Sequence, residues 1–343
     1  MGYQPLHSSG IQINNGDESM EITRRTLLKA AGALPLVGLS RISRADQYPS
    51  RPIRIVVPAS AATSIDVTAR FFTEPLSKRL NTPVVVENKP GTGGLIAYAA
   101  TAKTDPDGYT LMLAGIPMYL LPLLSKGTAT FDAQSDFTPV TRVARVSLGV
   151  VVAADSPYQT LDDLIQAMKK EPNKLRYSSQ GVGSTAHLCC ALLTHMSDTK
   201  AEHIPYKSTT TATTDVAAGR ITFTTQTAPA VLGLLESGKL RLLAISGEKR
   251  WESFPEIPTV AEAGVPGFEL SSFLDFVAPK GTPEPILQTL TREFSEIAAT
   301  PEYKEFCSKQ IIFPDVLDYR ALAREMPAEA AKWKKIVNLA QSG

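Results

Sequence analysis

The sequence has few cysteines, histidines and tryptophans, almost no net charge and no long apolar run, and each shortage argues against a class of protein. It holds three Cys, four His and two Trp in 343 residues, with a formal net charge of +1 at pH 7. Without residues 1–45, which carry five Lys and Arg and three Asp and Glu, the charge becomes −1. A nucleic-acid partner is therefore not expected. Because no segment is long and apolar enough to span a bilayer, we expect a soluble mature protein.

The three cysteines, Cys189, Cys190 and Cys307, are an odd number and show no metal-like spacing with the histidines. We interpret them as small buried hydrophobic residues and expect neither a disulfide framework nor a metal site. Cofactor motifs are missing as well. There is no phosphate loop with its lysine, and the pair Gly181 and Gly183 lacks the further glycine and downstream acid of a dinucleotide site.

A catalytic centre is not expected, because no Gly-x-Ser-x-Gly elbow is present and His187 has no evident nucleophile or orienting acid beside it. We interpret His187 as a histidine that is hydrogen-bonded to a neighbouring loop. The alternative from another class is an enzyme that uses His187 and Asp66 in one cleft.

Residues 1–45 have the features of an export signal, with a charged start, a weakly apolar middle and a small-x-small end. The pair Arg24 and Arg25 in TRRTLLK resembles the twin-arginine signal, which sends folded proteins across the bacterial inner membrane. An ordinary signal or an amphipathic helix is the alternative, and Met20 competes with Met1 as the true start. We therefore predict a periplasmic protein.

The mature chain predicts two α/β series, since 43% hydrophobic residues over this length can bury two cores. From Ile53 onward, strand and helix periodicities alternate, with strands predicted at 53–57, 83–87 and 109–113 and helices at 66–80 and 95–102. This order predicts a parallel sheet with helices on both faces.

A β-rich stretch, FTPVTRVARVSLGVVVAAD, follows without a helix, and we interpret it as a crossing between domains. A second series then runs from the capping box of Thr160 and Asp163 to the strand LRLLAIS. The strand SSFLDFVAP returns the chain to helical segments, the last interrupted at Pro327. We predict a first domain from 46–143 plus 247–343, a second from 144–246, and a ligand cleft between them.

The loops that follow the strands are the candidate site. Ser60 to Ile65 precedes a helix whose first N–H groups lack internal partners and carry partial positive charge, so an anion fits there. Asp66 would repel an anion unless a water or a ligand donor intervenes, and the alternative is that it is the helix N-cap.

The loop SSQGVGSTAHL is the second candidate. Gly181 and Gly183 permit close backbone approach, while Ser184 and Thr185 offer hydroxyl and N–H donors at the next helix start. Tyr206 ends the following strand and could present its hydroxyl to the cleft.

A series of segments occurs in an order typical of one family: YPSRPIRIVVP, VVVENKPGTGG, PDGYTLML, FTPVTRVA, YSSQGVGSTAHL, HIPYK, AGR, SGKLRLLAIS, IPTVAEAGVPGFE and VAPKGTP. With these segments the chain resembles the substrate-binding proteins of tripartite tricarboxylate transporters, the Bug family. The resemblance implies an α/β, two-domain periplasmic binding protein of the Venus flytrap type (type II-like), with mainly parallel sheets flanked by helices. It also implies capture of a small carboxylate-bearing solute without catalysis.

Carried over residue by residue, the resemblance implies which positions hold the ligand. They are Ser60, Ala61, Ala62, Thr63, Ser64, Asp66, Ala114, Ser179, Gly181, Gly183, Ser184, Thr185, Tyr206 and Gln226.

The chain departs from the family pattern at some of these positions. Where the family usually has Pro-Gly-Gly-Gly-Thr-Asp, this chain has AATSID, which narrows the accessible backbone conformations and leaves less room for a carboxylate. The family's Asp after ITFTT aligns with Gln226, so a partner for a ligand amine is missing. We hypothesise a monocarboxylate or a partly apolar or aromatic acid in place of a citrate-like one.

The expected partners are a small organic acid and the membrane components of the transporter, with the receptor itself a monomer. A transport-incompetent ligand sensor that acts with a sensor kinase is a third interpretation.

Overall fold

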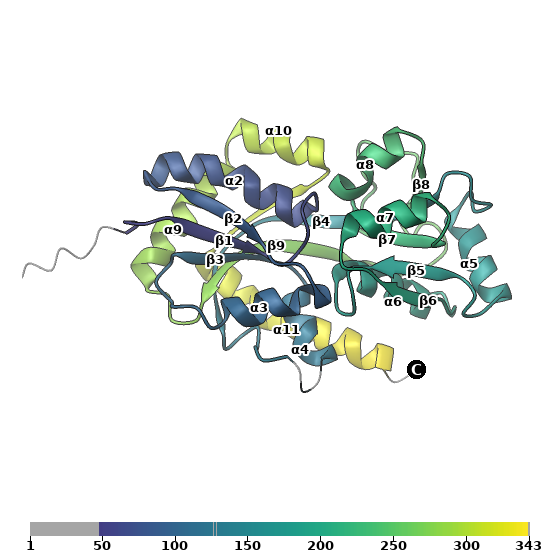
Figure 1. Cartoon of the computed structure of the whole chain (residues 1–343), viewed down its shortest axis with the longest axis horizontal. Coiled ribbons are helices and arrows are strands. Elements are labelled where there is room, and N and C mark those ends of the chain that lie inside the picture. The colour runs from purple at the N-terminus through teal and green to yellow at the C-terminus, as the bar shows by residue number, and fades with distance from the viewer. Residues whose placement is uncertain (1–47, 126, 128, 342–343) are drawn as a thin grey trace, which may run out of the picture. The chain divides into compact units, whose positions relative to one another are not determined.

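The computed structural model describes residues 48–125, 127 and 129–341 (Figure 1). Residues 47–343 belong to one compact unit. The predicted export signal, residues 1–45, lies outside the described residues. Within the described ranges, no helix combines the length and apolarity that crossing a membrane requires.

The described residues form ten strands, which supply the walls of the site. They are β1 (Ile53–Val57), β2 (Val84–Asn88), β3 (Thr110–Ala114), β4 (Phe137–Ala153), β5 (Arg176–Ser179), β6 (Glu202–Pro205), β7 (Phe223–Thr227), β8 (Leu240–Ile245), β9 (Ser271–Pro279) and β10 (Phe313–Asp318).

Helices cover the strands on both sides. They are α2 (Ser64–Leu80), the short 3-10 turn η2 (Thr92–Gly94), α3 (Leu95–Thr101), α4 (Pro117–Leu124), α5 (Leu161–Lys170), α6 (Thr185–Met196), α7 (Thr209–Ala217), α8 (Ala228–Glu236), α9 (Glu284–Ala298), α10 (Pro301–Gln310) and α11 (Tyr319–Gln341).

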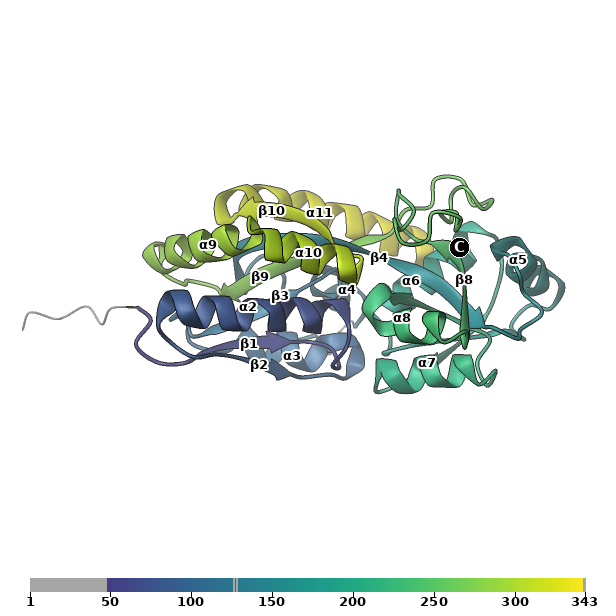
Figure 2. The ribbon, with the colours of Figure 1, turned by 90° about the horizontal axis from the view of Figure 1, so that it is seen from above.

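The strands follow the order β2-β1-β3-β9-β4-β7-β5-β6, and β8 and β10 also pair with β4. We call β1, β2, β3, β9 and β10 with their helices the first lobe, and β5 to β8 with theirs the second lobe. The long strand β4 pairs with strands of both, and Figure 2 shows it passing from one group of elements to the other. The β-rich stretch that was predicted to cross between domains is thus one continuous strand, β4. The division into two domains at residues 144 and 246 stays a prediction.

The sequence predicts mainly parallel sheets, and the sheets are mixed. Strand β1 is parallel to β2 and β3, and β5 is parallel to β6 and β7. Strand β4 is antiparallel to β9 and to β7, and β9 is antiparallel to β3. The physical reason is that a chain leaving one lobe and returning must run in opposite directions along the two crossings.

A local signal explains the start of helix α5. The predicted capping box is present, with the Asp163 N–H donating to Thr160 Oγ1 and the Asp163 carboxylate accepting from the Thr160 N–H. Helix α11 continues through Pro327, which corrects the predicted interruption. Its residues Leu322, Met326 and Trp333 are buried, so packing outweighs the lost backbone hydrogen bond. Helix α4 and strand β10 were not predicted.

The cysteines are buried side chains, as interpreted from the sequence. Cys189, Cys190 and Cys307 are each at most 1% exposed and are free thiols. Burial raises the pKa of the Cys307 thiol to about 11, so it stays uncharged and unreactive.

Candidate ligand-binding site

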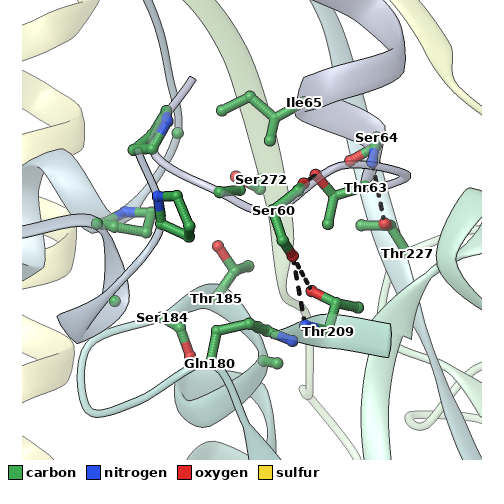
Figure 3. Close-up of a pocket in the computed structure, with 18 of the residues that line it drawn as sticks. Ser60, Thr63, Ser64, Ile65, Gln180, Ser184, Thr185, Thr209, Thr227 and Ser272 are labelled. Atoms are coloured by element: carbon green, nitrogen blue, oxygen red, sulfur yellow. Dashed lines mark hydrogen bonds between the residues drawn. The ribbon is translucent and has the colours of Figure 1, made fainter. Parts of the chain in front are cut away.

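A cavity of about 100 Å³ lies where the loops of the two lobes face each other (Figure 3). The loops after β1, β2 and β3 line it from the first lobe, and those after β5, β6 and β7 line it from the second. These loops meet because the carboxyl ends of parallel strands share one edge of a sheet. Helices α2, α4, α6 and α7 begin at lining residues, so their N-terminal amides are directed toward the cavity.

The cavity wall combines hydroxyl and amide groups with an apolar floor. Strands β4 and β9 supply Val146, Leu148 and Leu274, and Lys207 is the single charged residue among the described ones that line the cavity. The polar lining residues are Ser60, Thr63, Ser64, Gln180, Ser184, Thr185, Thr209, Gln226, Thr227 and Ser272. In the described ranges, no group of three or more His, Cys, Asp or Glu could hold a metal ion.

The two lobes touch on both sides of the cavity. On one side, Ser60 Oγ donates to Thr209 Oγ1 at 3.1 Å and accepts from the Thr209 N–H at 3.3 Å (Figure 3). The Ser64 N–H donates to Thr227 Oγ1 at 3.4 Å. On the other side, the Gly93 N–H donates to the Gln180 carbonyl at 3.2 Å. These hydrogen bonds define a closed arrangement of the lobes.

Asp66 does not line the cavity. Its carboxylate accepts from the Ala62 N–H at 3.0 Å, the Asn88 Nδ2–H at 2.8 Å and the Arg70 Nε–H at 3.0 Å, and the residue is 2% exposed. The interpretation of Asp66 as the N-cap is wrong, because α2 begins at Ser64 and its N-cap is Thr63. Asp66 instead orders the loop after β1.

The first turn of α6 leaves donors free at the cavity. Ser184 is the N-cap, and its Oγ accepts from the His187 N–H at 3.3 Å. The amides of Thr185 and Ala186 have no hydrogen-bond acceptor among the described residues, and both residues line the cavity. Gly183 is required here, because it has a φ of +82° and an added Cβ would lie 2.5 Å from a Leu121 methyl carbon.

His187 supports this loop and lies outside the cavity lining. Its Nδ1 accepts from the Gly183 N–H at 3.4 Å, and its ring centroid is 4.5 Å from that of His203. The interpretation as a histidine hydrogen-bonded to a loop is confirmed. Burial, with a smaller effect of His203, lowers the pKa of His187 to about 4.

We expect His187 to make folding stability depend on pH. Between pH about 4 and 6.5 the unfolded chain binds a proton at this histidine and the folded chain does not, so the free energy of unfolding falls as pH drops through this window, by roughly 2 kcal/mol. Urea denaturation at several pH values in this window measures the free energy of unfolding, and its slope against pH should be smaller for His187→Gln than for the unaltered protein. His195→Gln, at an exposed position on the same helix, is the control. An unchanged slope in His187→Gln contradicts the prediction.

Six of the sequence-predicted site residues line the cavity: Ser60, Thr63, Ser64, Ser184, Thr185 and Gln226. Others lie beside it and support the loops. The Tyr206 hydroxyl donates to Asp215 at 2.7 Å, and Ser179 Oγ lies 2.7 Å from His203 Nε2. The remaining predicted residues outside the lining are Ala61, Ala62, Asp66, Ala114, Gly181 and Gly183.

Sequence reasoning missed several lining residues. Lys207 lies in the loop after β6, Thr209 begins the next helix and Thr227 ends β7, so the rule that ligands bind at strand ends, which found Ser60, could have found them. Tyr98, within α3, and Ser272, on the returning strand β9, had no local signal, because only the packing of the lobes brings them to the cavity.

Two crossing strands and a cavity between helix-capped strand ends define a bilobal α/β solute-binding protein. Over residues 68–341 the chain matches the family described as "Tripartite tricarboxylate transporter family receptor". The chain belongs to this family.

Individual relatives agree with this assignment over most of their length. The chain is 36% identical over 316 residues to the "UPF0065 protein in gbd 5'region" of Cupriavidus necator, covering 92% of this chain and 95% of that protein. The structure titled "R. palustris Rpa4515 with adipate" is 32% identical with a TM-score of 0.81, covering 86% of this chain and 98% of that one. The structure of the periplasmic binding protein BugD is 28% identical with a TM-score of 0.80, and the match covers 86% of this chain and 99% of that one.

Proposed function

We propose that this protein is an extracytoplasmic receptor that captures a small carboxylate-bearing solute and delivers it to the membrane components of a tripartite tricarboxylate transporter. The observation that carries the proposal is the cavity itself, where Lys207 and the free amides of Thr185 and Ala186 face a space that no carboxylate of the described residues lines. Such donors stabilise an anion. Adipate in the Rpa4515 structure supports the same ligand class.

The finer points of the proposal concern location and motion. Residues 1–45 would direct export by the twin-arginine route to the periplasm, where the mature protein works as a monomer. The segments 46–143 plus 247–343 and 144–246 would move as two domains about β4 and β9, opening the cavity to admit the solute.

The test is the identification and return of the solute. Mass spectrometry of ligand released from protein purified from its host should reveal an organic acid, and titration calorimetry with that acid should give one site per chain. Incubation should return the acid unchanged, because the proposal includes no catalysis. Conversion of the acid, or retention of a compound without a carboxylate, would contradict the proposed function.

Lys207 should contribute to affinity for every acid that binds. It is exposed at the rim and has no ion-pair partner among the described residues, so Lys207→Gln should weaken binding about three- to tenfold at low salt and less at high salt. Lys239→Gln, an exposed lysine that does not line the cavity, is the matched control. Equal effects of the two substitutions in calorimetry would show that Lys207 acts only through net charge.

A further inference from the structure

We propose that three side chains outside the cavity, those of Asp66, Arg70 and Asn88, hold the loop after β1 in the conformation that captures the ligand. We call these three residues the loop clamp. The inference rests on the proposed function and deepens it, because it makes Arg70 and Asn88 positioning residues for binding although neither lines the cavity.

The loop after β1 makes two contributions to the site that depend on its conformation. Ser60 lines the cavity, and its Oγ donates to Thr209 Oγ1 at 3.1 Å and accepts from the Thr209 N–H at 3.3 Å (Figure 3). Ile65, in the first turn of α2, also lines the cavity, and its amide has no acceptor among the described residues. Both groups face the ligand and the second lobe only while the loop keeps this shape.

Asn88, the last residue of β2, holds the first end of the loop. Its Nδ2 donates to the Ala59 carbonyl at 3.1 Å and to Asp66 Oδ1 at 2.8 Å. A carbonyl and a carboxylate only accept hydrogen bonds, so the nitrogen of the side-chain amide has to point this way. The Ala59 carbonyl belongs to the peptide group that leads into Ser60. Asn88 therefore fixes the position of Ser60.

Asp66 holds the other end of the loop. Its Oδ2 accepts from the Ala62 N–H at 3.0 Å. Ala62 has a φ of +63°, a left-handed conformation that glycine adopts freely and alanine does not. The hydrogen bond from Asp66 thus offsets backbone strain that would otherwise move the loop into another conformation.

Arg70 ties the other two clamp residues together. Its Nε donates to the two Asp66 oxygens at 3.0 and 3.1 Å, and its Nη2 donates to Asn88 Oδ1 at 2.8 Å. The Asp66 side chain is 3% exposed, so without these partners its charge would be costly to bury. Because Asn88 is bonded through both its nitrogen and its oxygen, the network favours one arrangement, and the loop is preorganised before a ligand arrives.

Replacing Asn88 with alanine tests the loop clamp. The variant loses three hydrogen bonds, so its loop should spend less time in the capturing conformation, and ligand binding should weaken about tenfold. Calorimetry with adipate, malate, hexanoate and benzoate measures the affinity for the acid that binds most tightly, at a temperature where the variant is folded. Gln288→Ala removes an exposed hydrogen bond to Glu284 in the same lobe and, as the matched control, should leave the affinity unchanged.

Ala62→Gly distinguishes positioning of the loop from a packing role of Asn88. In the Asn88→Ala background this substitution should recover about threefold in affinity, because glycine keeps the left-handed conformation without help. Alone it should change the affinity by less than about twofold, since the intact clamp already holds the loop. A packing defect around Asn88 would not respond to a change at Ala62. Absence of recovery in the double variant, or an affinity of Asn88→Ala equal to that of Gln288→Ala, would overturn the inference.

Amide hydrogen exchange of the ligand-free protein tests the loop clamp without a ligand. The Ala62 amide should exchange at least about fivefold faster in Asn88→Ala than in the unaltered protein, whereas the amides of α9 should not change. Unchanged exchange at Ala62 would overturn the loop clamp and leave the receptor function intact. Faster exchange, together with failure of every acid to bind the unaltered protein, would overturn the proposed function and not the loop clamp.

Discussion

Replacing Arg142 with methionine is expected to lower the free energy of unfolding by about 3–5 kcal/mol. Arg142, on β4, is 1% exposed and donates to Asp275 on β9 through Nε at 2.7 Å and Nη2 at 3.2 Å. Its Nη1 donates to Glu325 on α11 at 2.6 Å. The substitution keeps the volume and leaves the Asp275 carboxylate, which is fully buried, without its principal partner.

The free energy of unfolding that Arg142→Met loses should depend on pH. Burial raises the pKa of Asp275 to about 6, while Arg142 opposes this rise, so removal of Arg142 raises the pKa further. A carboxyl whose folded pKa lies above its unfolded pKa destabilises the fold when it is ionised, and this cost is relieved as pH falls through the folded pKa. The deficit of Arg142→Met should therefore be largest above neutral pH and smaller near pH about 5.

Urea denaturation at the two pH values checks both statements. The double variant Arg142→Met with Asp275→Leu removes both charges and should recover much of the lost stability, because no buried group is left unpaired. A deficit below about 1 kcal/mol above neutral pH would contradict the expectation.

Replacing Gly93 with alanine is expected to weaken ligand binding by roughly ten- to a hundredfold. An added Cβ at Gly93 would lie 2.6 Å from the Val182 carbonyl oxygen and 2.9 Å from the Ser184 amide nitrogen. Both atoms belong to the second lobe, so the contact exists only when the lobes are closed. A clash of this size with backbone atoms shifts the equilibrium toward an open form that holds the ligand on one side, and the apparent affinity falls with the closed population.

Gly238→Ala separates closure from backbone strain. Gly93 has a φ of +66° and Gly238 a φ of +64°, and an added Cβ at Gly238 meets nothing within 4 Å. Both substitutions should therefore cost about 1 kcal/mol of stability through left-handed strain, and only Gly93→Ala should change affinity. Calorimetry measures the affinities, and small-angle scattering of the ligand-loaded protein reports closure. Equal affinities of the two variants would show that the lobes close without the Gly93 contact.

Much of the fold could be predicted because its signals are local. The βαβαβ order from Ile53 follows from periodicity, and the capping box of Thr160 and Asp163 marks a helix start from four residues alone. Ser60 and Ser184 could be placed at the site for the same reason, since each lies in a loop that leads from a strand into a helix. Asp66 shows where local signals fail. Helix α2 begins at Ser64, two residues earlier than predicted, so Asp66 is not the N-cap but a buried acid in the first turn that pairs with Arg70.

By itself the sequence determined the alternation of strands and helices, the family and the strand-end loops in which a ligand site had to lie. Only the tertiary structure decided which loop residues face the cavity, that Tyr98 and Ser272 join them, and that Gly93 touches the opposite lobe. The physical reason is that helix caps and strand periods act over a few residues, whereas a cavity wall is made by side chains from distant segments. Their positions depend on how β4 and β9 set one lobe against the other.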